Sequence, residues 1–291
     1  MIKEHPHFKI KVFFDAATFT LSYVVYDEKS KDAVIIDSVL DFDSHSGEYS
    51  YTSAQKVVDF IKEQELELRY ILETHAHADH LSASVFLKEH FPTAKIGIGK
   101  NIQIVQSEFS RLFNLDIPTD GSQFDELFED EQKVCAGTLE FKVLFTPGHT
   151  PACTSLLFED AVFTGDALFM PDYGTGRCDF PKGSAEDLYE SIKNKLYSLP
   201  DETIVYTGHD YQPGGRELRF CATIKEQKES NIRLKERTTQ EEFVKFRKER
   251  DATLNAPKLL LPSIQVNIDA GHLPETESNG LRYLKIPLLR K

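Results

Sequence analysis

The sequence predicts a layered α/β domain. Apolar segments of strand type alternate with amphipathic segments of helix type along the 291 residues, and no tandem repeat or low-complexity linker divides them. With 40% hydrophobic and 11% aromatic residues, the chain can build a large core. We therefore expect residues 1–291 to form a single domain that ends in a C-terminal extension of helix and strand.

The N-terminal part predicts a sheet. Apolar runs bounded by turn residues predict strands at Lys9–Phe14, Leu21–Tyr26 and Ala33–Ile36, the last followed by Asp37. Ser53 is expected to cap a helix, because a hydroxyl there can accept a free amide of the first turn. Tyr70–Leu72 is expected to be a buried strand that leads into a histidine-rich loop, with the next helix beginning near Leu81.

Strands and helices continue to alternate in the second half. Further strands are expected at Lys95–Ile98, Leu139–Leu144, Ser155–Phe158, Ala161–Thr164 and Ile204–Tyr206. Ser184 has the spacing of a capping box and precedes a helical face of Leu188, Ile192, Leu196 and Leu199. The composition of Arg216–Arg237 predicts a helix, and Thr239 with Glu242 again has capping-box spacing.

Charge and composition exclude several classes of partner. The chain has 34 Lys and Arg against 47 Asp and Glu, a formal net charge of −13, so nucleic acid and anionic membranes would be repelled. An anionic substrate would therefore need local arginines. No apolar stretch reaches the roughly 18 residues of a membrane span, the start lacks the apolar core of a signal peptide, and the 4 cysteines form no Cys-x-x-Cys. We expect a cytoplasmic protein with reduced thiols.

Histidines and carboxylates gather in four short segments that each follow an expected strand. They are His75-Ala-His77-Ala-Asp79-His80, Pro147-Gly-His149, Gly165-Asp166 and Gly208-His209-Asp. Turns at neighbouring strand ends can direct such side chains to one point, and imidazole with carboxylate is a common ligand set for transition metals.

The spacing within the first segment allows two adjacent metal sites. In an extended segment residues i and i+2 point the same way, so His75 and His77 can face one centre while Asp79 and His80 face another. The alternative is a polar turn of mutually hydrogen-bonded residues. It would bury several titratable rings without a compensating cation, which carries a large desolvation cost, so a metal is the favoured interpretation.

These segments resemble a known family. His75-x-His77-x-Asp79-His80, followed by His149, Asp166 and His209 in that order, is similar to the metal-binding signature of the metallo-β-lactamase superfamily. The resemblance implies an αββα four-layer sandwich with the metal centre in a cleft at one edge between the two sheets. Finer features resemble persulfide dioxygenases, particularly their bacterial β-lactamase-like hydrolase branch. They are Asp166-Ala-Leu-Phe-Met-Pro-Asp-Tyr-Gly-Thr-Gly-Arg177-Cys-Asp179-Phe180, His209-Asp-Tyr211, Asn231-Ile-Arg233-Leu and the tail from Leu261.

The resemblance implies a non-haem iron enzyme that oxidises glutathione persulfide with O2 and water to sulfite and glutathione. One Fe(II) per chain would be held by His75, His149 and Asp166, a two-histidine, one-carboxylate arrangement with open positions for substrate sulfur and dioxygen. His77, Asp79, His80 and His209 would either bind a second ion or act as hydrogen-bonding partners around one ion. Members of this kind are often dimers, so the resemblance also favours a homodimer.

The substrate and supporting residues follow from the same match. Arg177, Arg233 and the hydroxyl of Tyr211 are candidates for binding the carboxylates of glutathione, which suit the bidentate fork of arginine. Arg177 has an alternative role in an ion pair with Asp179 or Asp172, and Arg233 in a solvated helix face. Asp179, Tyr211 and Asp210 are candidates for hydrogen bonding to a ligand histidine.

Two other functions compete with the dioxygenase. The first is a dinuclear zinc hydrolase of the glyoxalase II or thioesterase type, with one or two Zn(II) per chain and a hydroxide that attacks a thioester carbonyl. The second is a non-enzymatic protein that uses the metal as a structural staple. Structural zinc sites favour four closed ligands that commonly include Cys, which this segment pattern lacks.

Overall fold

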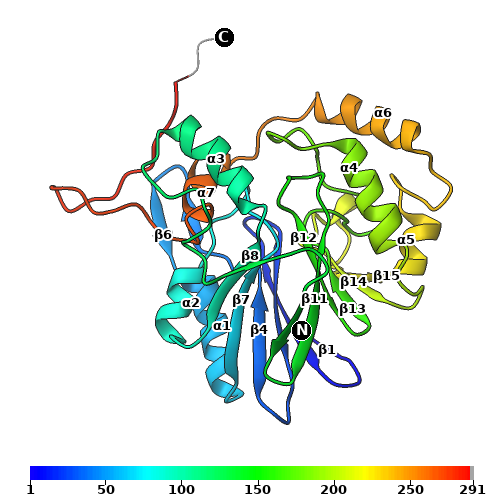
Figure 1. Ribbon diagram of the computed structural model, residues 1–291, viewed down its shortest axis with the longest axis horizontal. Coiled ribbons are helices and arrows are strands. Elements are labelled where there is room, and N and C mark those ends of the chain that lie inside the picture. Colours follow the sequence, from blue (N-terminus) through cyan, green and yellow to red (C-terminus); the bar gives the residue numbers. More distant parts are fainter. Residues whose placement is uncertain (289–291) are drawn as a thin grey trace.

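Two β-sheets face each other and carry helices on their outer faces, as seen in the computed structural model, which describes residues 1–288 (Figure 1). One sheet has 7 strands in the order β1-β2-β3-β4-β7-β8-β9. They are Ile2–Glu4, Lys9–Asp15, Thr20–Tyr26, Asp32–Ile36, Glu67–Glu73, Lys95–Gly99 and Glu126–Phe128. The other has 6 strands in sequence order from β10 to β15. They are Lys133–Ala136, Leu139–Phe145, Thr154–Phe158, Ala161–Phe163, Ile204–Tyr206 and Cys221–Thr223.

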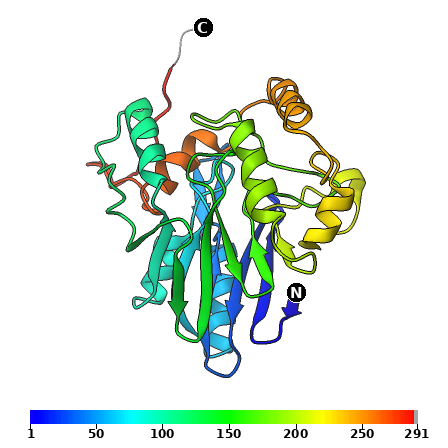
Figure 2. The same ribbon diagram turned by 45° about the vertical axis from the view of Figure 1, so that its right-hand side comes forward.

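The helices divide between the two outer faces (Figures 1 and 2). Those on the first sheet's side are α1 (Thr52–Glu63), α2 (Ser84–His90), α3 (Ile102–Phe113) and α7 (Leu260–Asn267). Those on the second sheet's side are α4 (Ala185–Glu190), which continues into a π-helical segment Ser191–Leu196, α5 (Ile224–Ser230) and α6 (Gln240–Asp251). A short hairpin of β5 (Asp41–Asp43) and β6 (Glu48–Ser50) precedes α1.

Three apolar layers separate these elements. The layer between the sheets contains alternate residues of the first sheet, such as Ile10 and Val12 of β2, against Phe141 and Phe158 of the second. The opposite face of the first sheet packs on α1, α3 and α7, and that of the second on α4, α5 and α6. This is the expected αββα four-layer sandwich, with the two-residue period of the strands assigning each side chain to one layer.

The expected strands are present, but three helix expectations need correction. Ser53 lies inside α1 instead of capping it, and its amide and hydroxyl both donate to the carboxylate of Asp41 on β5. The helix expected near Leu81 begins at Ser84, because Leu81 forms an isolated β-bridge with Leu40.

The segment Arg216–Arg237 is not one helix. It contains β15 and only the seven-residue α5, which is capped by Thr223. Arg216 is held outside any helix by ion pairs with Asp172 and Asp210, and Cys221–Thr223 pairs with β14. Helix propensity is a weak preference that such tertiary contacts override.

The caps of the later helices agree better with the sequence. Ser184 accepts a hydrogen bond from the Asp187 amide, and Thr239 with Glu242 forms the full capping box. The C-terminal part of the chain is helical in α6 and α7, and no strand follows β15 within residues 1–288. All four cysteines are free thiols. Among the described residues, no helix combines the length and apolar character needed to cross a bilayer.

Candidate metal centre

The clustered histidines and carboxylates come together at one edge of the sandwich. β7 of the first sheet ends at Glu73, just before the His75–His80 segment, while His149, Asp166 and His209 follow β11, β13 and β14 of the second sheet. Strands β13 and β14 are parallel, and β11 runs in the same direction because two antiparallel pairings separate it from β13. Their carboxyl ends therefore meet at the same edge.

The ligand atoms form two groups. His75, His149 and Asp166 each offer one atom within 4.8 Å of the others, and so do His77, Asp79 and His80. His209 lies between the groups, since its Nε2 is 3.1 Å from Asp79 Oδ2 and 3.3 Å from Asp166 Oδ1. The structure thus places together all seven residues that the sequence singled out.

Burial leaves many of these atoms without a hydrogen-bond partner. Every one of the five histidines is at most 4% exposed. Among the described residues, atoms without a partner include Nε2 of His75, His80 and His209, Nδ1 of His77, and one carboxylate oxygen each of Asp79 and Asp166. Buried polar atoms are normally paired, and so many convergent orphans are explained by a bound cation. The donor set of imidazole and carboxylate fits a transition metal.

Gly165 allows Asp166 to approach the first segment. Its φ is +47°, and a Cβ at this position would lie 2.5 Å from Thr74 Oγ1. A side chain would therefore be strained and would displace Thr74, which contacts His75.

Asp37, which the sequence reasoning did not assign to the site, orients two of the histidines. It is 2% exposed, follows β4 with a φ of 53°, and lies beside β7 because β4 and β7 are parallel neighbours. Its Oδ1 accepts from the Thr74 amide at 2.7 Å and from His77 Nε2 at 3.0 Å, and its Oδ2 accepts from Thr74 Oγ1 at 2.8 Å. The sequence does contain a signal for Asp37, because it is a carboxylate just after a buried strand, as Asp166 is.

The same contacts determine which ring nitrogens face the cluster. Because Thr74 Oγ1 gives its proton to Asp37, it accepts from His75 Nδ1 at 3.0 Å, which leaves the lone pair of His75 on Nε2. His77 donates through Nε2, which leaves Nδ1 for the cluster. His149 Nδ1 donates to the Arg177 carbonyl at 2.7 Å, so its Nε2 is free to face Asp166. Ligating histidines are usually held in this way.

Burial and neighbouring charges shift the pKa values of the clustered side chains. Burial lowers the pKa of His75 well below its usual value, and the neighbouring His77 and His149 lower it further. Burial also acts to lower the pKa of His77, yet Asp37 and Glu73 raise it well above its usual value. For Asp79, the charges of His209 and His80 outweigh burial and hold the carboxyl pKa well below its usual range. The metal-free centre thus combines an uncharged His75 ring with an ionised Asp79, and a cation bound at His77 Nδ1 would replace the proton that the raised pKa of His77 favours.

A cavity of about 560 Å³ opens onto the centre, and Asp79, His149 and Asp166 are among the residues that line it. Asp172, Tyr173 and Thr175, from the segment that follows Asp166, line it as well. Five basic residues also line it, Arg177, Arg233, Arg247, Arg250 and Lys258. Burial and the adjacent Arg247 and Arg250 lower the pKa of Arg233, as expected where cations are crowded.

All three predicted substrate residues line this cavity, but they differ in the partners that their side chains already have. Arg177 lines it, but its Nε and Nη2 both donate to Asp179 at 2.6 Å, which is the alternative role given above. Arg233 lies 4.2 Å over the Phe246 ring and has no carboxylate partner among residues 1–288. Tyr211 stacks on His209 with ring centroids 5.5 Å apart.

Three supporting roles need correction. Tyr211 stacks on His209 and makes no hydrogen bond to a histidine among residues 1–288. Asp179 does not hydrogen bond to a histidine; its carboxylate is taken by Arg177, whose carbonyl serves His149 instead. Asp210 accepts from Arg216 and from the Arg219 amide, so it fixes the segment after His209 without touching the ring.

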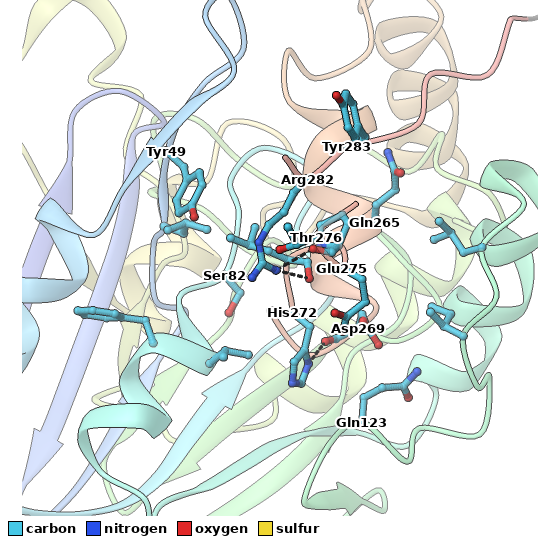
Figure 3. Close-up of a pocket in the computed structure, with 18 of the residues that line it drawn as sticks. Tyr49, Ser82, Gln123, Gln265, Asp269, His272, Glu275, Thr276, Arg282 and Tyr283 are labelled. Atoms are coloured by element: carbon cyan, nitrogen blue, oxygen red, sulfur yellow. Dashed lines mark hydrogen bonds between the residues drawn. The ribbon is translucent and has the colours of Figure 1, made fainter. Parts of the chain in front are cut away.

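A larger cavity, about 790 Å³, lies beside the C-terminal segment and contains none of the seven clustered residues (Figure 3). Arg282 crosses it to donate to the carbonyl of Pro274, and His272 donates to the Asp269 carbonyl. Its ionisable lining is mainly acidic, with Glu89, Asp116 and Glu275, so the smaller cavity is the candidate substrate site.

Comparisons with known proteins agree with this geometry. The sequence profile described as Metallo-beta-lactamase superfamily matches residues 16–209. The chain is 52% identical to "Glyoxylase B2" of Dictyostelium discoideum, over 96% of this chain and 97% of that protein. It is 33% identical to human "Persulfide dioxygenase ETHE1, mitochondrial", over 86% of this chain and 82% of that protein. The crystal structure of ETHE1 from Myxococcus xanthus superimposes with a TM-score of 0.73 at 33% identity, covering 90% of this chain and 99% of that one.

Proposed function

Because this chain belongs to the metallo-β-lactamase superfamily, whose members bind metal ions, we propose that it is a non-haem iron persulfide dioxygenase acting on glutathione persulfide. The observation that carries the proposal is the group His75, His149 and Asp166, two histidines and one carboxylate that converge beside a cavity. The similarity to persulfide dioxygenases over most of the chain supports it.

Bound iron would supply an open coordination site for sulfur and the electrons that activate O2. The protein's own residues bind and orient the substrate. Arg233, Arg250 and Lys258 line the cavity and would attract the two carboxylates of glutathione to a chain whose net charge is −13. His149 and Asp166 line the same cavity, so a substrate held by these cations would bring its persulfide sulfur to them.

The overall reaction balances without a further reductant. One persulfide, one O2 and one water give one thiol, one sulfite and two protons. The sulfur–sulfur bond breaks, the terminal sulfur is oxidised by O2, and the third oxygen of sulfite comes from water. The aromatic wall of Phe169, Tyr173, Phe180 and Tyr211 limits access of bulk water and of other reductants to the metal.

The second candidate is a dinuclear zinc hydrolase of the glyoxalase II type. It is favoured by the second group His77, Asp79 and His80, whose ring nitrogens also lack partners, and by the similarity to "Glyoxylase B2". If this chain is such a hydrolase, its Asp166 and His209 would complete a two-metal site.

Elemental analysis of anaerobically purified protein, coupled to an oxygen electrode, separates the two candidates. The dioxygenase predicts about one iron per chain and O2 uptake on glutathione persulfide. His149→Ala should abolish uptake with little change in thermal stability, while His272→Ala, an exposed histidine, should behave as wild type. Two zinc ions with turnover of a glutathione thioester and no O2 uptake would instead identify the hydrolase.

A further inference from the structure

The turn that carries the second group of candidate ligands has few backbone partners of its own. Residues 74–83 connect β7 to α2 without forming helix or strand, apart from the bridge at Leu81. This segment is buried, and buried carbonyl and amide groups need hydrogen-bond partners. Some other part of the chain must supply them.

Asn267, the last residue of α7, supplies three of these partners. Its Nδ2 donates to the carbonyls of His77 and His80, both at 2.8 Å, and its Oδ1 accepts from the Ser82 amide at 2.8 Å. The side chain is buried, with 4% exposure. Both N–H groups and the oxygen of one amide are therefore used on a single turn.

Helix α7 is anchored independently of that turn. Ile264 and Ile268 lie in the core cluster that also contains side chains of α1 and α3. Gln106 on α3 donates to the Ile268 carbonyl at 2.8 Å. On the other side of the turn, Ser82 and Ser84 donate to Glu73 of β7. The turn is thus held between β7 and a fixed helix more than 180 residues away in sequence.

We propose that Asn267 is a positioning residue that ties α7 to the turn 77–82 and so sets the directions of His77, Asp79 and His80. The three residues share one backbone segment, and two of them carry the carbonyls that Asn267 holds. The C-terminal extension thereby becomes part of the metal centre without contributing a ligand. This inference rests on the metal-binding part of the proposed function and not on the reaction.

The test compares two isosteric amide-to-acid substitutions on the same helix. Asn267→Asp removes both donors to the turn. Gln265→Glu is the matched control, because Gln265 also makes three backbone hydrogen bonds, to Leu261 and Lys285, and none to the turn. Figure 3 shows Gln265 beside the tail, near Tyr283. Both variants are measured by peptide-resolved hydrogen exchange without metal and by zinc titration against a chromophoric chelator.

We expect faster exchange over residues 77–82 in Asn267→Asp and a zinc affinity about tenfold or more below that of Gln265→Glu. Equal exchange of the turn in the two variants would overturn the proposal. If Asn267→Asp does not fold, the same exchange and zinc measurements are made on Asn267→Ala, with Gln265→Ala as its control. In the wild type, zinc should slow hydrogen exchange over both residues 77–82 and residues 264–270. Slower exchange in the turn alone would contradict a link between the turn and α7 through Asn267.

Failure of the two ideas can be told apart. A wild-type chain that binds no zinc or iron would refute the proposed function. The exchange comparison in the metal-free proteins would still decide whether Asn267 holds the turn.

Discussion

Asp37→Asn is the substitution that tests the organisation of the metal centre most sharply. The wild-type carboxylate accepts from three donors, the Thr74 amide, Thr74 Oγ1 and His77 Nε2. An asparagine of the same shape can keep its oxygen toward the Thr74 amide and His77 only by turning its NH2 toward Thr74 Oγ1. The hydroxyl then accepts from Asn. Its own proton either goes to His75 Nδ1, which reverses the His75 tautomer, or is left buried without an acceptor.

The reversed tautomer places a proton on His75 Nε2, the atom that faces the cluster. The opposite amide orientation is no better, because NH2 would then face two donors. Changes to groups that orient ligand histidines lower metal affinity by about 10- to 100-fold, or about 1.4–2.7 kcal/mol. Since Asp37 acts on two histidines, we expect the upper part of that range.

The assay is a competitive metal titration with zinc or Fe(II), together with thermal unfolding of the metal-free protein. Asp41→Asn is the control, since Asp41 is also a carboxylate that accepts two hydrogen bonds, but from Ser53 on α1. If Asp37→Asn folds and binds metal as tightly as the Asp41 variant, the tautomer argument is wrong.

Three further predictions address stability and substrate. Gly165→Ala should lower the unfolding free energy by about 1–3 kcal/mol and weaken metal binding, as measured by denaturant melts and metal titration, because its Cβ would meet Thr74 at a positive φ. Arg233→Ala should raise KM for glutathione persulfide about tenfold with kcat little changed, whereas Arg219→Ala, whose partner is Glu226 outside the cavity, should not. Burial alone would raise the pKa of Asp32, but the Thr138 amide and Arg69 hold it below its ordinary value. Its contribution to stability is therefore complete above about pH 4 and lost as pH falls through the lower folded-state pKa, so Asp32→Asn should flatten the acid limb of a stability–pH curve.

Sequence patterns predicted the parts of the fold that depend on local burial. The strands around Val24, Ile35 and Ile71 are apolar because both faces of the first sheet are covered, and such runs are easily recognised. The errors lie where contacts between distant segments decide. Leu81 joins a bridge with Leu40, and Arg216 is fixed by Asp172 and Asp210, neither of which is visible in local composition.

The candidate ligands were predictable because their motif is short and their order along the chain is distinctive. The residues that orient them were not. Asp37 is 40 positions from His77 in sequence, and only the parallel pairing of β4 with β7 brings the two together. Asn267 comes from a C-terminal helix with no motif that refers to the metal turn. For Arg177 the sequence allows both a substrate contact and an ion pair with Asp179, and only side-chain geometry shows that the ion pair forms.

The most direct test of the central claim is the ratio of sulfite formed to O2 consumed by iron-loaded protein with glutathione persulfide. The balanced reaction predicts one sulfite and one glutathione per O2 consumed, and no turnover by His149→Ala. Persulfide or thioester cleavage without O2 uptake would contradict the assignment of this site as a dioxygenase.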